Sequence, residues 1–328
     1  MREAGEGAAT PSVARRARRA LGRIYRGWSR GVGRLNDACG EFLRWVALHV
    51  RSVLVRIKVR RKEILVMNCG ENGEIDGLYA QFTVILGLLE HCEAWAQVYA
   101  GAKVDFEDQG LYYDSSFGRN SWEYFFEPID MGRQSQAGER RIGLREQYRF
   151  AQRGEDMPRS SAHALISHHI HPKPHVQRKV DSFVRAHFAE CHVIGIHYRG
   201  TDKWLESPRV PYEEVCAAVR RAIAAIESDR YRLFVATDEQ GFLDCMLNVF
   251  GNKVTFWDTR RSVDGTPNWV DGENNYKKGE DAVIDCLLLS RCQQLIRTAS
   301  NLGYCATLFN PAMPVVLVSR TLIADTRV

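Results

Sequence analysis

Hydrophobic and polar positions follow two different spacings between residues 63 and 99. Residues 64–67 are a short apolar run, typical of a buried strand, and a Gly-rich turn follows them. Between Leu78 and Trp95 the apolar residues recur at helical spacing, and a new strand begins at Val98. This order of strand, turn, helix and strand is typical of α/β architecture.

A second series of alternating elements begins at His192. Its pattern predicts strands over 193–198, 232–236, 254–256 and 314–318, and helices over 212–227, 242–250 and 281–297. The two series meet near 175–190, which predicts an α/β fold with two facing Rossmann-like domains. We therefore expect an N-terminal arm over 1–62, a first domain over 63–185 and a second domain over 190–328.

Three segments between these elements have no clear period. The aromatic-rich stretch 106–127 fits core packing, with sugar stacking as the alternative. Residues 132–160 are polar and rich in Arg and Gly, which predicts a loop. Five histidines lie between 163 and 175, but Pro172 and Pro174 interrupt the helix that would align them, and no nearby Cys completes a zinc pattern. We expect an interdomain linker there, and no metal site.

Charge separates the arm from the rest of the chain. Residues 1–62 carry 16 Lys and Arg against four acids, while the remainder has a net charge of −7. The acidic remainder and the lack of a basic groove interleaved with aromatics argue against a nucleic-acid partner. Residues 15–62, and most clearly 42–59, combine apolar and cationic positions. They fit either peripheral contact with an anionic membrane or a helix packed on the protein.

The cellular compartment is predicted from what the sequence lacks. Arg44, Arg51, Arg56 and Lys58 interrupt the most apolar stretch, which therefore cannot supply the roughly 20 apolar residues of a membrane span. The basic start has no apolar stretch or cleavage site of a secretory signal, although it also fits an organelle transit peptide. The nine cysteines contain no C-x-x-C and fit reduced thiols. We expect a cytoplasmic protein, either free or peripheral on the inner face of a membrane.

The strongest chemical signal lies where the strand over 193–198 ends. The chain there is expected to expose five polar side chains in seven residues: His197, Arg199, Thr201, Asp202 and Lys203. Open α/β sheets bind ligands at the carboxyl ends of their strands. Arg199 offers a planar fork for a diphosphate and Lys203 a second, compact cation, so both can stabilise a diphosphate leaving group. A surface salt-bridge cluster is the alternative.

Two further polar sets follow. The strand over 232–236 ends in Thr237 and Asp238. Asp281 and Asp285 are four residues apart, so a helix places both on one face, where an Asp can accept hydrogen bonds from a guanine edge.

Ser300 and Asn301 follow a short strand-like run and can donate to phosphate. Each of these sets alone also fits ordinary polarity at strand ends and helix surfaces.

Three motifs in fixed order resemble those of a known enzyme family. His-x-Arg-x-Thr-Asp-Lys, Val-Ala-Thr-Asp-Glu and Asp…Asp-x-x-x-Leu-Ser…Thr-x-Ser are similar to the motifs of the α1,6-fucosyltransferases and their rhizobial nodulation relatives. Protein O-fucosyltransferases share a looser version. The resemblance covers about residues 191–318. It implies a GT-B fold, GDP-fucose as donor, a glycan or glycoconjugate acceptor, inversion at the anomeric carbon, and no metal or other cofactor.

The resemblance also implies roles for single residues. Arg199 grips the β-phosphate, Lys203 assists near the acceptor or phosphate, and His197 contacts the nucleotide. Asp285 contacts the guanine and Ser300 the phosphate. In the same comparison, residues 63–185 become the acceptor-side domain and residues 190–328 the nucleotide-sugar-binding domain.

Two positions depart from the family pattern. Glu206 lies close to the place of the family's candidate general base, one residue out of register. Gly200 stands where the α1,6 branch has the second of two arginines, so the linkage is not implied.

The chain contains no Asp-x-Asp, the motif with which metal-dependent transferases hold a divalent ion, and this supports the metal-free interpretation. Two alternatives stay open. One is the same fold with another nucleotide sugar, and the other is a non-catalytic binding protein that uses its basic arm.

Overall fold

The computed structural model describes residues 62–68, 77–129, 131, 137–201, 208–267 and 273–318. Residues Arg61–Val328 form one compact unit. The described part of the chain contains no helix of the length and apolarity that crossing a membrane requires. The arm predicted over 1–62 lies outside the described residues, apart from Lys62, so its contact with a membrane stays a prediction.

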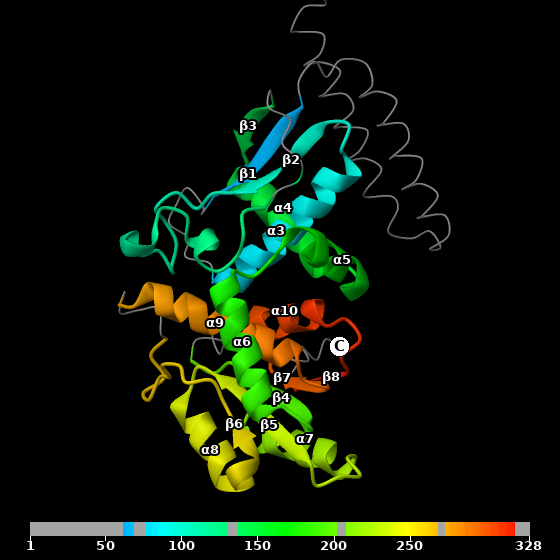
Figure 1. Cartoon of the computed structure of the whole chain (residues 1–328), viewed down its shortest axis with the longest axis vertical. Helices are drawn as coiled ribbons and strands as arrows, with labels where there is room; N and C mark the ends of the chain where they lie inside the picture. Colours follow the sequence, from blue (N-terminus) through cyan, green and yellow to red (C-terminus); the bar gives the residue numbers. More distant parts are fainter. Residues whose placement is uncertain are drawn as a thin grey trace, which may run out of the picture. The chain divides into compact units, whose positions relative to one another are not determined.

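A three-stranded parallel sheet occupies the first part of this unit. It contains β1 (Glu63–Met67), β2 (Tyr99–Val104) and β3 (Gly138–Arg141) in the order β2-β1-β3 (Figure 1). The helix between β1 and β2 is α3 (Leu78–Ala94), which is buried along most of its length. The strand–turn–helix–strand order predicted from residue 64 onward is therefore confirmed.

The loop predicted over 132–160 is wrong. β3 lies in this segment and is followed by α4 (Leu144–Glu155). The helix is polar on most sides, and its buried residues, Phe150 and Gly154, pack against α3. A Cβ on Gly154 would lie 2.1 Å from the carbonyl oxygen of Thr83, and one on Gly87 would lie 2.0 Å from that of Phe150. The two helices approach closely at these glycines, and the polar composition of α4 explains why a loop was predicted.

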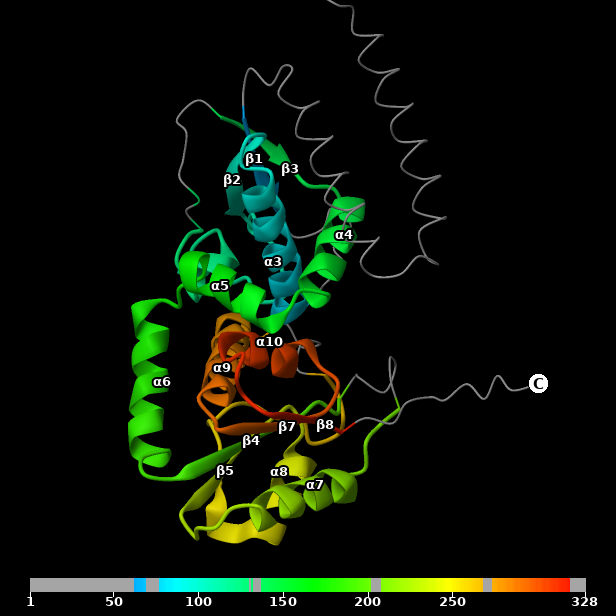
Figure 2. The ribbon, with the colours of Figure 1, turned by 90° about the vertical axis from the view of Figure 1, so that its right-hand side faces the viewer.

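The linker predicted around the histidines is mostly helical. α5 (Arg159–His169) and α6 (Pro174–His187) are separated only by a short extended segment. Pro174 occupies the first turn of α6, where a missing N–H costs nothing. Figure 2 shows α6 running from the region of α5 to the start of the second sheet. Among the described residues no group of metal-ligating side chains is found.

A five-stranded parallel sheet forms the second part. Its strands are β4 (His192–Tyr198), β5 (Tyr231–Thr237), β6 (Val254–Thr255), β7 (Gln294–Arg297) and β8 (Val315–Leu317). Their order is β6-β5-β4-β7-β8, so the chain leaves β4 first toward one edge and later returns to its other side. This is the strand order of a Rossmann-type sheet, with its switch point beside β4.

Helices cover both faces of this sheet. They are α7 (Tyr212–Ala224), α8 (Gln240–Phe250), α9 (Asn275–Ser290) and α10 (Asn301–Phe309). One buried cluster joins the sheet to α7 and α8, and another joins its other face to α9, α10, α6 and the first sheet. The α/β prediction is confirmed. Arg61–Val328 is grouped as one compact unit, without a division near 185 or 190. The predicted domain limits at these positions therefore stay predictions.

The long helix predicted over 281–297 is wrong at both ends. α9 begins at Asn275 and ends at Ser290, and Gln294–Arg297 is strand β7. The apolar pair Leu295–Ile296 continues the helical spacing of α9 although it belongs to a buried strand. Periodicity alone does not separate a short buried strand from a helix, so the break at 291–293 was missed.

Candidate active site

The polar ends of β4, β5 and β7 gather at one edge of the second sheet. β4 lies between β5 and β7 in parallel register, with His197 opposite Ala236 on one side and Arg297 on the other. Strands that lead to opposite sides of β4 leave a crevice at their carboxyl ends. The described members of the first and second predicted sets, His197, Arg199, Thr237 and Asp238, therefore lie at one edge of the sheet.

Asp238 holds the loop that follows β4. Its Oδ1 accepts a hydrogen bond from the backbone N of Gly200 (3.0 Å) and its Oδ2 accepts one from the Thr201 hydroxyl (2.6 Å). Arg199 Nε lies 3.2 Å from the same Oδ2, and its backbone N donates to Thr298 Oγ1 (3.0 Å). Asp238 therefore fixes the direction of the predicted phosphate-binding arginine.

Glu239 explains why Gly200 stands in the motif. The buried Glu239 carboxylate accepts hydrogen bonds from Arg209 (2.8 Å) and from the Tyr212 hydroxyl (2.7 Å). A Cβ on Gly200 would lie 2.2–2.5 Å from the carboxylate atoms of Glu239. A second arginine fits at this position only if the Glu239 carboxylate moves away. The hydroxyl of Thr237 accepts a hydrogen bond from the backbone N–H of Glu239, two residues along the chain, at 3.2 Å.

His197 is buried at the end of β4, with only 4% of its surface exposed. Burial lowers its pKa to about 3, and the charges of Arg199 and Arg297 act in the same direction. The imidazole is therefore neutral at physiological pH. Its Nδ1 is buried and has no hydrogen-bond partner among the described residues, and a Cβ on Gly303 would lie 2.9 Å from it. This nitrogen can act as donor or acceptor, according to tautomer.

Ser300 and Asn301 begin α10. Ser300 is the N-cap residue and Asn301 the first helical residue, so backbone N–H groups point out of this end of the helix toward any bound anion. Arg297 lies beside them, with its guanidinium 3.5 Å from the Ser300 carbonyl oxygen. Its Nε is buried without a partner among the described residues. Arg297 is a cation of the site that the sequence did not single out.

Asp281 and Asp285 are both buried on α9, as their spacing predicted. Asp281 accepts hydrogen bonds from Trp257 Nε1 (2.8 Å) and from Lys277. Asp285 differs, because its Oδ1 is buried without a partner among the described residues. Burial raises the pKa of Asp285 to about 8, against the attraction of the nearby Arg261 guanidinium. The carboxyl group is thus mostly protonated at neutral pH until a hydrogen-bond donor reaches it.

Arg261 completes this end of the crevice from the segment after β6. It donates to the carbonyl oxygens of Trp257 (2.7 Å) and Thr259 (3.0 Å), and its Nε is buried without a partner among the described residues. Burial lowers its pKa, with Asp285 acting in the opposite direction. The sequence marked neither Trp257 nor Arg261, because they reach α9 only in the folded chain.

The first turn of α10 contacts both α9 and the end of β4. Cys286, next to Asp285, donates from its Sγ to the Leu302 carbonyl oxygen at 3.7 Å. The following residue of α10, Gly303, lies against His197. His197 Nδ1 therefore lies against α10, and α9 contacts the same turn of α10 through Cys286.

Three predicted site residues lie outside the described part of the chain: Asp202, Lys203 and Glu206. Their roles stay predictions.

Comparisons with known proteins place the fold. No known family model matches the sequence. No curated protein matches it either. A solved structure of NodZ α-1,6-fucosyltransferase soaked with GDP-fucose matches with a TM-score of 0.50 and 20% identity, over 76% of this chain and 93% of that one. FUT1 of Arabidopsis thaliana in complex with GDP matches with a TM-score of 0.51 and 11% identity, over 80% of this chain and 72% of that one. The chain thus shares the GT-B fold of these fucosyltransferases, as the motifs implied.

Proposed function

We propose that this chain is a glycosyltransferase that transfers fucose from GDP-fucose to a saccharide acceptor, with inversion and without a metal. The observation that carries the proposal is the pair of buried, unpartnered atoms, His197 Nδ1 and Asp285 Oδ1, in the crevice of a GT-B fold. Folded proteins rarely leave such atoms unsatisfied, and a bound ligand is the simplest partner for both.

A guanine base fits Asp285. Its N1–H and 2-amino group lie on one edge and can both donate to the two oxygens of a carboxylate. Uracil and adenine do not present two adjacent donors in this arrangement. The two matching structures, which were obtained with GDP-fucose and GDP, support the same choice of nucleotide.

The diphosphate would lie between Arg199 and the N-terminus of α10. Arg199 is oriented by Asp238, and Arg297 adds positive charge beside Ser300. Negative charge on the diphosphate increases as the sugar departs. Fixed cations and helix N–H groups therefore stabilise the transition state more than the ground state.

The proposed transfer step is a single displacement at C1 of fucose. The acceptor hydroxyl oxygen attacks C1 of fucose from the face opposite the diphosphate, and a new C1–O bond forms. The bond between C1 and the β-phosphate oxygen breaks, and its electron pair leaves with GDP. A carboxylate takes the hydroxyl proton, and the family resemblance assigns this role to Glu206. The anomeric configuration is inverted.

Nucleotide binding tests the proposal. Isothermal calorimetry of the full chain with GDP, UDP and ADP, in excess EDTA, is expected to show tight binding of GDP only. Arg199→Ala is expected to weaken GDP binding by about 10- to 100-fold, the effect of losing one charge-assisted contact. Arg220→Ala, at an exposed position of α7, is the matched control and should bind as the unmodified chain does. Equal affinity for UDP, loss of binding in EDTA, or unchanged binding by Arg199→Ala would contradict the proposal.

A further inference from the structure

Phe117 is an aromatic residue whose side chain is exposed to solvent. It ends the short helix η2 (Ser115–Phe117) and is 52% exposed, whereas Trp122, Phe125 and Phe126 of the same segment are fully buried. Its ring stacks on that of Tyr276 with centroids 3.6 Å apart and an angle of 11° between the planes. One ring face is covered by Tyr276, so the exposed surface lies on the other face and the edges.

Tyr276 is fixed beneath it. Its hydroxyl lies 3.1 Å from His175 Nε2 and donates to Glu280 Oε1 at 3.4 Å. The rings of Tyr124 and Phe125 flank it at 5.8 and 5.4 Å. The Tyr276 ring therefore cannot turn away from Phe117 without breaking these contacts.

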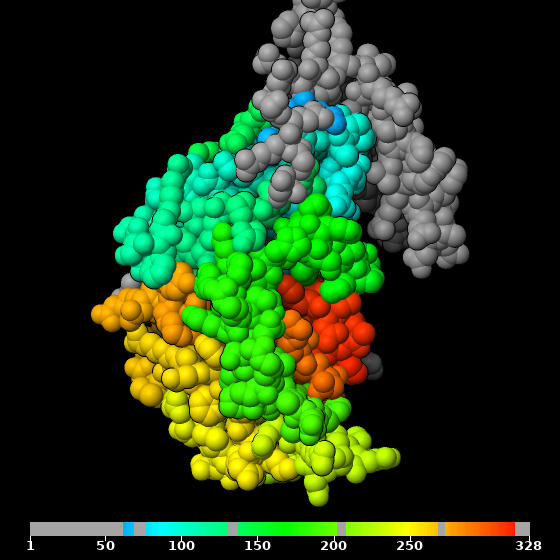
Figure 3. Space-filling view, in the orientation of Figure 1, coloured from blue at the N-terminus to red at the C-terminus, as the bar shows by residue number. Residues whose placement is uncertain are grey.

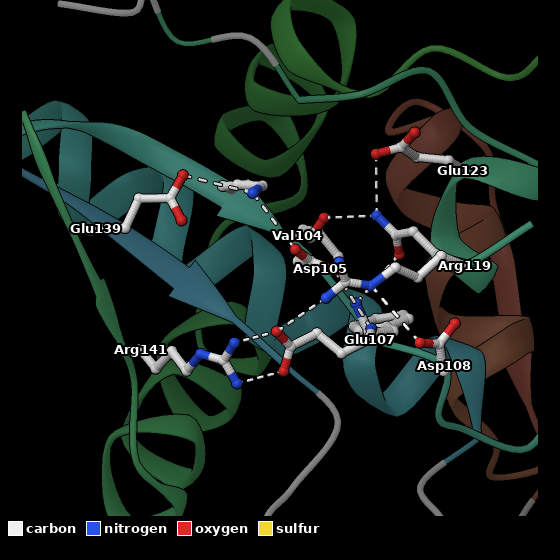
Figure 4. A network of polar contacts seen from close by, with 11 residues as sticks. Val104, Asp105, Glu107, Asp108, Arg119, Glu123, Glu139 and Arg141 are labelled. Atoms are coloured by element: carbon white, nitrogen blue, oxygen red, sulfur yellow. Dashed lines mark hydrogen bonds and ion pairs between the residues drawn. The ribbon is translucent and has the colours of Figure 1, made fainter. Parts of the chain in front are cut away.

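The loop that carries Phe117 is held by a polar network, shown in Figure 4. Glu107 pairs with both Arg119 and Arg141, and so ties the loop after β2 to β3. The Asn120 amide donates to the Val104 carbonyl oxygen at 2.8 Å, and the Tyr124 hydroxyl donates to that of Gly118 at 2.6 Å. The stacked pair is therefore pre-ordered.

A pre-ordered aromatic face suits a pyranose ring. The C–H groups on one face of a sugar stack on an aromatic ring, and a fixed platform avoids the entropy cost of ordering it on binding. Arg119 and Asp108 have side chains 62% and 56% exposed, and together with Ser115 and Ser116 they offer donors and acceptors to sugar hydroxyls.

A lipid surface fits less well, because the exposed large apolar residues of the described part are scattered. They are Phe117, Tyr148, Val249, Val263, Val316 and Leu317. A single ring with charged neighbours offers no continuous apolar patch for insertion.

We propose that Phe117, stacked on Tyr276, is the platform on which a pyranose ring of the acceptor saccharide binds. This rests on the proposed function. Figure 3 shows the loop of Phe117 and the start of α9 side by side, and Asn275 of α9 donates to the Tyr113 carbonyl oxygen of that loop at 3.3 Å. Tyr276 lies nine residues before Asp285 on α9, about 14 Å along the helix. The platform is thus close to the donor crevice and separate from it.

Saturation-transfer NMR of the full chain tests the platform. The probes are cellotetraose, mannotetraose, maltotetraose and N-acetylchitotetraose, each without nucleotide. At least one is expected to receive saturation on the C–H protons of one ring face. Phe117→Ala should weaken its binding by about five- to tenfold, the scale of one aromatic contact. Phe117→Tyr should retain binding, and so should Tyr148→Ala, which removes a similarly exposed ring (60%) from α4.

The outcomes separate this proposal from the transferase proposal. No transfer to any probe, or equal binding by Phe117→Ala and the unmodified chain, would overturn the platform even if GDP binds normally. GDP titrated into Phe117→Ala should give unchanged affinity, which shows that the variant is folded. If no chain binds GDP while the probes still depend on Phe117, the transferase proposal fails and saccharide binding stands.

Discussion

The raised pKa of Asp285 leads to a quantitative prediction about donor binding. The carboxyl group has a pKa of about 8, so about one molecule in ten carries the charged form at pH 7. A guanine edge offers two N–H donors and therefore requires the charged form. GDP binding is expected to release a proton from Asp285 near neutral pH.

The size of the effect follows from the ionised fraction. This fraction is about one half at pH 8 and about one hundredth at pH 6, so the Asp285 contribution to GDP affinity should fall about 50-fold between them. Affinity rises with pH and levels off above about pH 8. Asp285→Asn removes the titration and places an N–H₂ group against the guanine donors. It should weaken binding by about 100-fold at pH 8.

Calorimetry at several pH values, in buffers of different ionisation enthalpy, measures both affinity and proton release. Asp285→Asn provides the correction for the ionisation of GDP itself. Inosine diphosphate lacks the 2-amino group and should bind about tenfold more weakly than GDP to the unmodified chain but equally to Asp285→Asn. A pH-independent difference between the two proteins, or discrimination retained in Asp285→Asn, would refute the role of this carboxylate.

Three further predictions concern the fold and the crevice. Gly87→Ala should lower the melting temperature by several degrees, because the added Cβ would clash with the Phe150 carbonyl oxygen. In the control Gly77→Ala the added Cβ contacts nothing, so its melting temperature in the same thermal unfolding experiment should be unchanged. Because the pKa of Asp285 is raised in the folded state, the free energy of unfolding should fall as pH rises from about 4 to about 8. In thermal scans, the melting temperature of Asp285→Asn should depend less on pH than that of the unmodified chain and should be higher at pH 8. Equal dependence of the melting temperature on pH in the two proteins would contradict this. Asp238→Asn should slow GDP-fucose hydrolysis at least about tenfold in steady-state assays, since it frees Arg199; an unchanged rate would show that Arg199 needs no such support.

Hydrophobic periodicity was sufficient to predict a strand or helix where the element keeps the same surroundings along its length. β4 and β5 contain short apolar runs, over 193–196 and 233–236, in the middle of a sheet, and α7 keeps its helical spacing, so all three could be predicted. α4 was missed because it buries only Phe150 and Gly154, and its close approach to α3 depends on Gly87 and Gly154. A helix with so few buried side chains is dominated by polar residues in the sequence.

The motif residues of the candidate site could be predicted from the sequence, whereas the residues that surround them in the folded chain could not. His197, Arg199 and Asp285 stand in sequence patterns whose chemistry can be read directly. Arg261 and Arg297 enter the crevice only when the segment after β6 and the end of β7 come to lie beside α9 and α10. No spacing in the sequence encodes these neighbours.

The most direct test is turnover of the donor. The full chain is incubated with GDP-fucose, GDP-mannose, UDP-galactose and UDP-N-acetylglucosamine in excess EDTA, beside Arg199→Ala, and the release of nucleoside diphosphate is measured. A GDP-fucose-dependent transferase without a metal predicts release of GDP from GDP-fucose alone, undiminished by EDTA and lost in Arg199→Ala. Release of UDP, abolition by EDTA, or an unchanged rate in Arg199→Ala would contradict it.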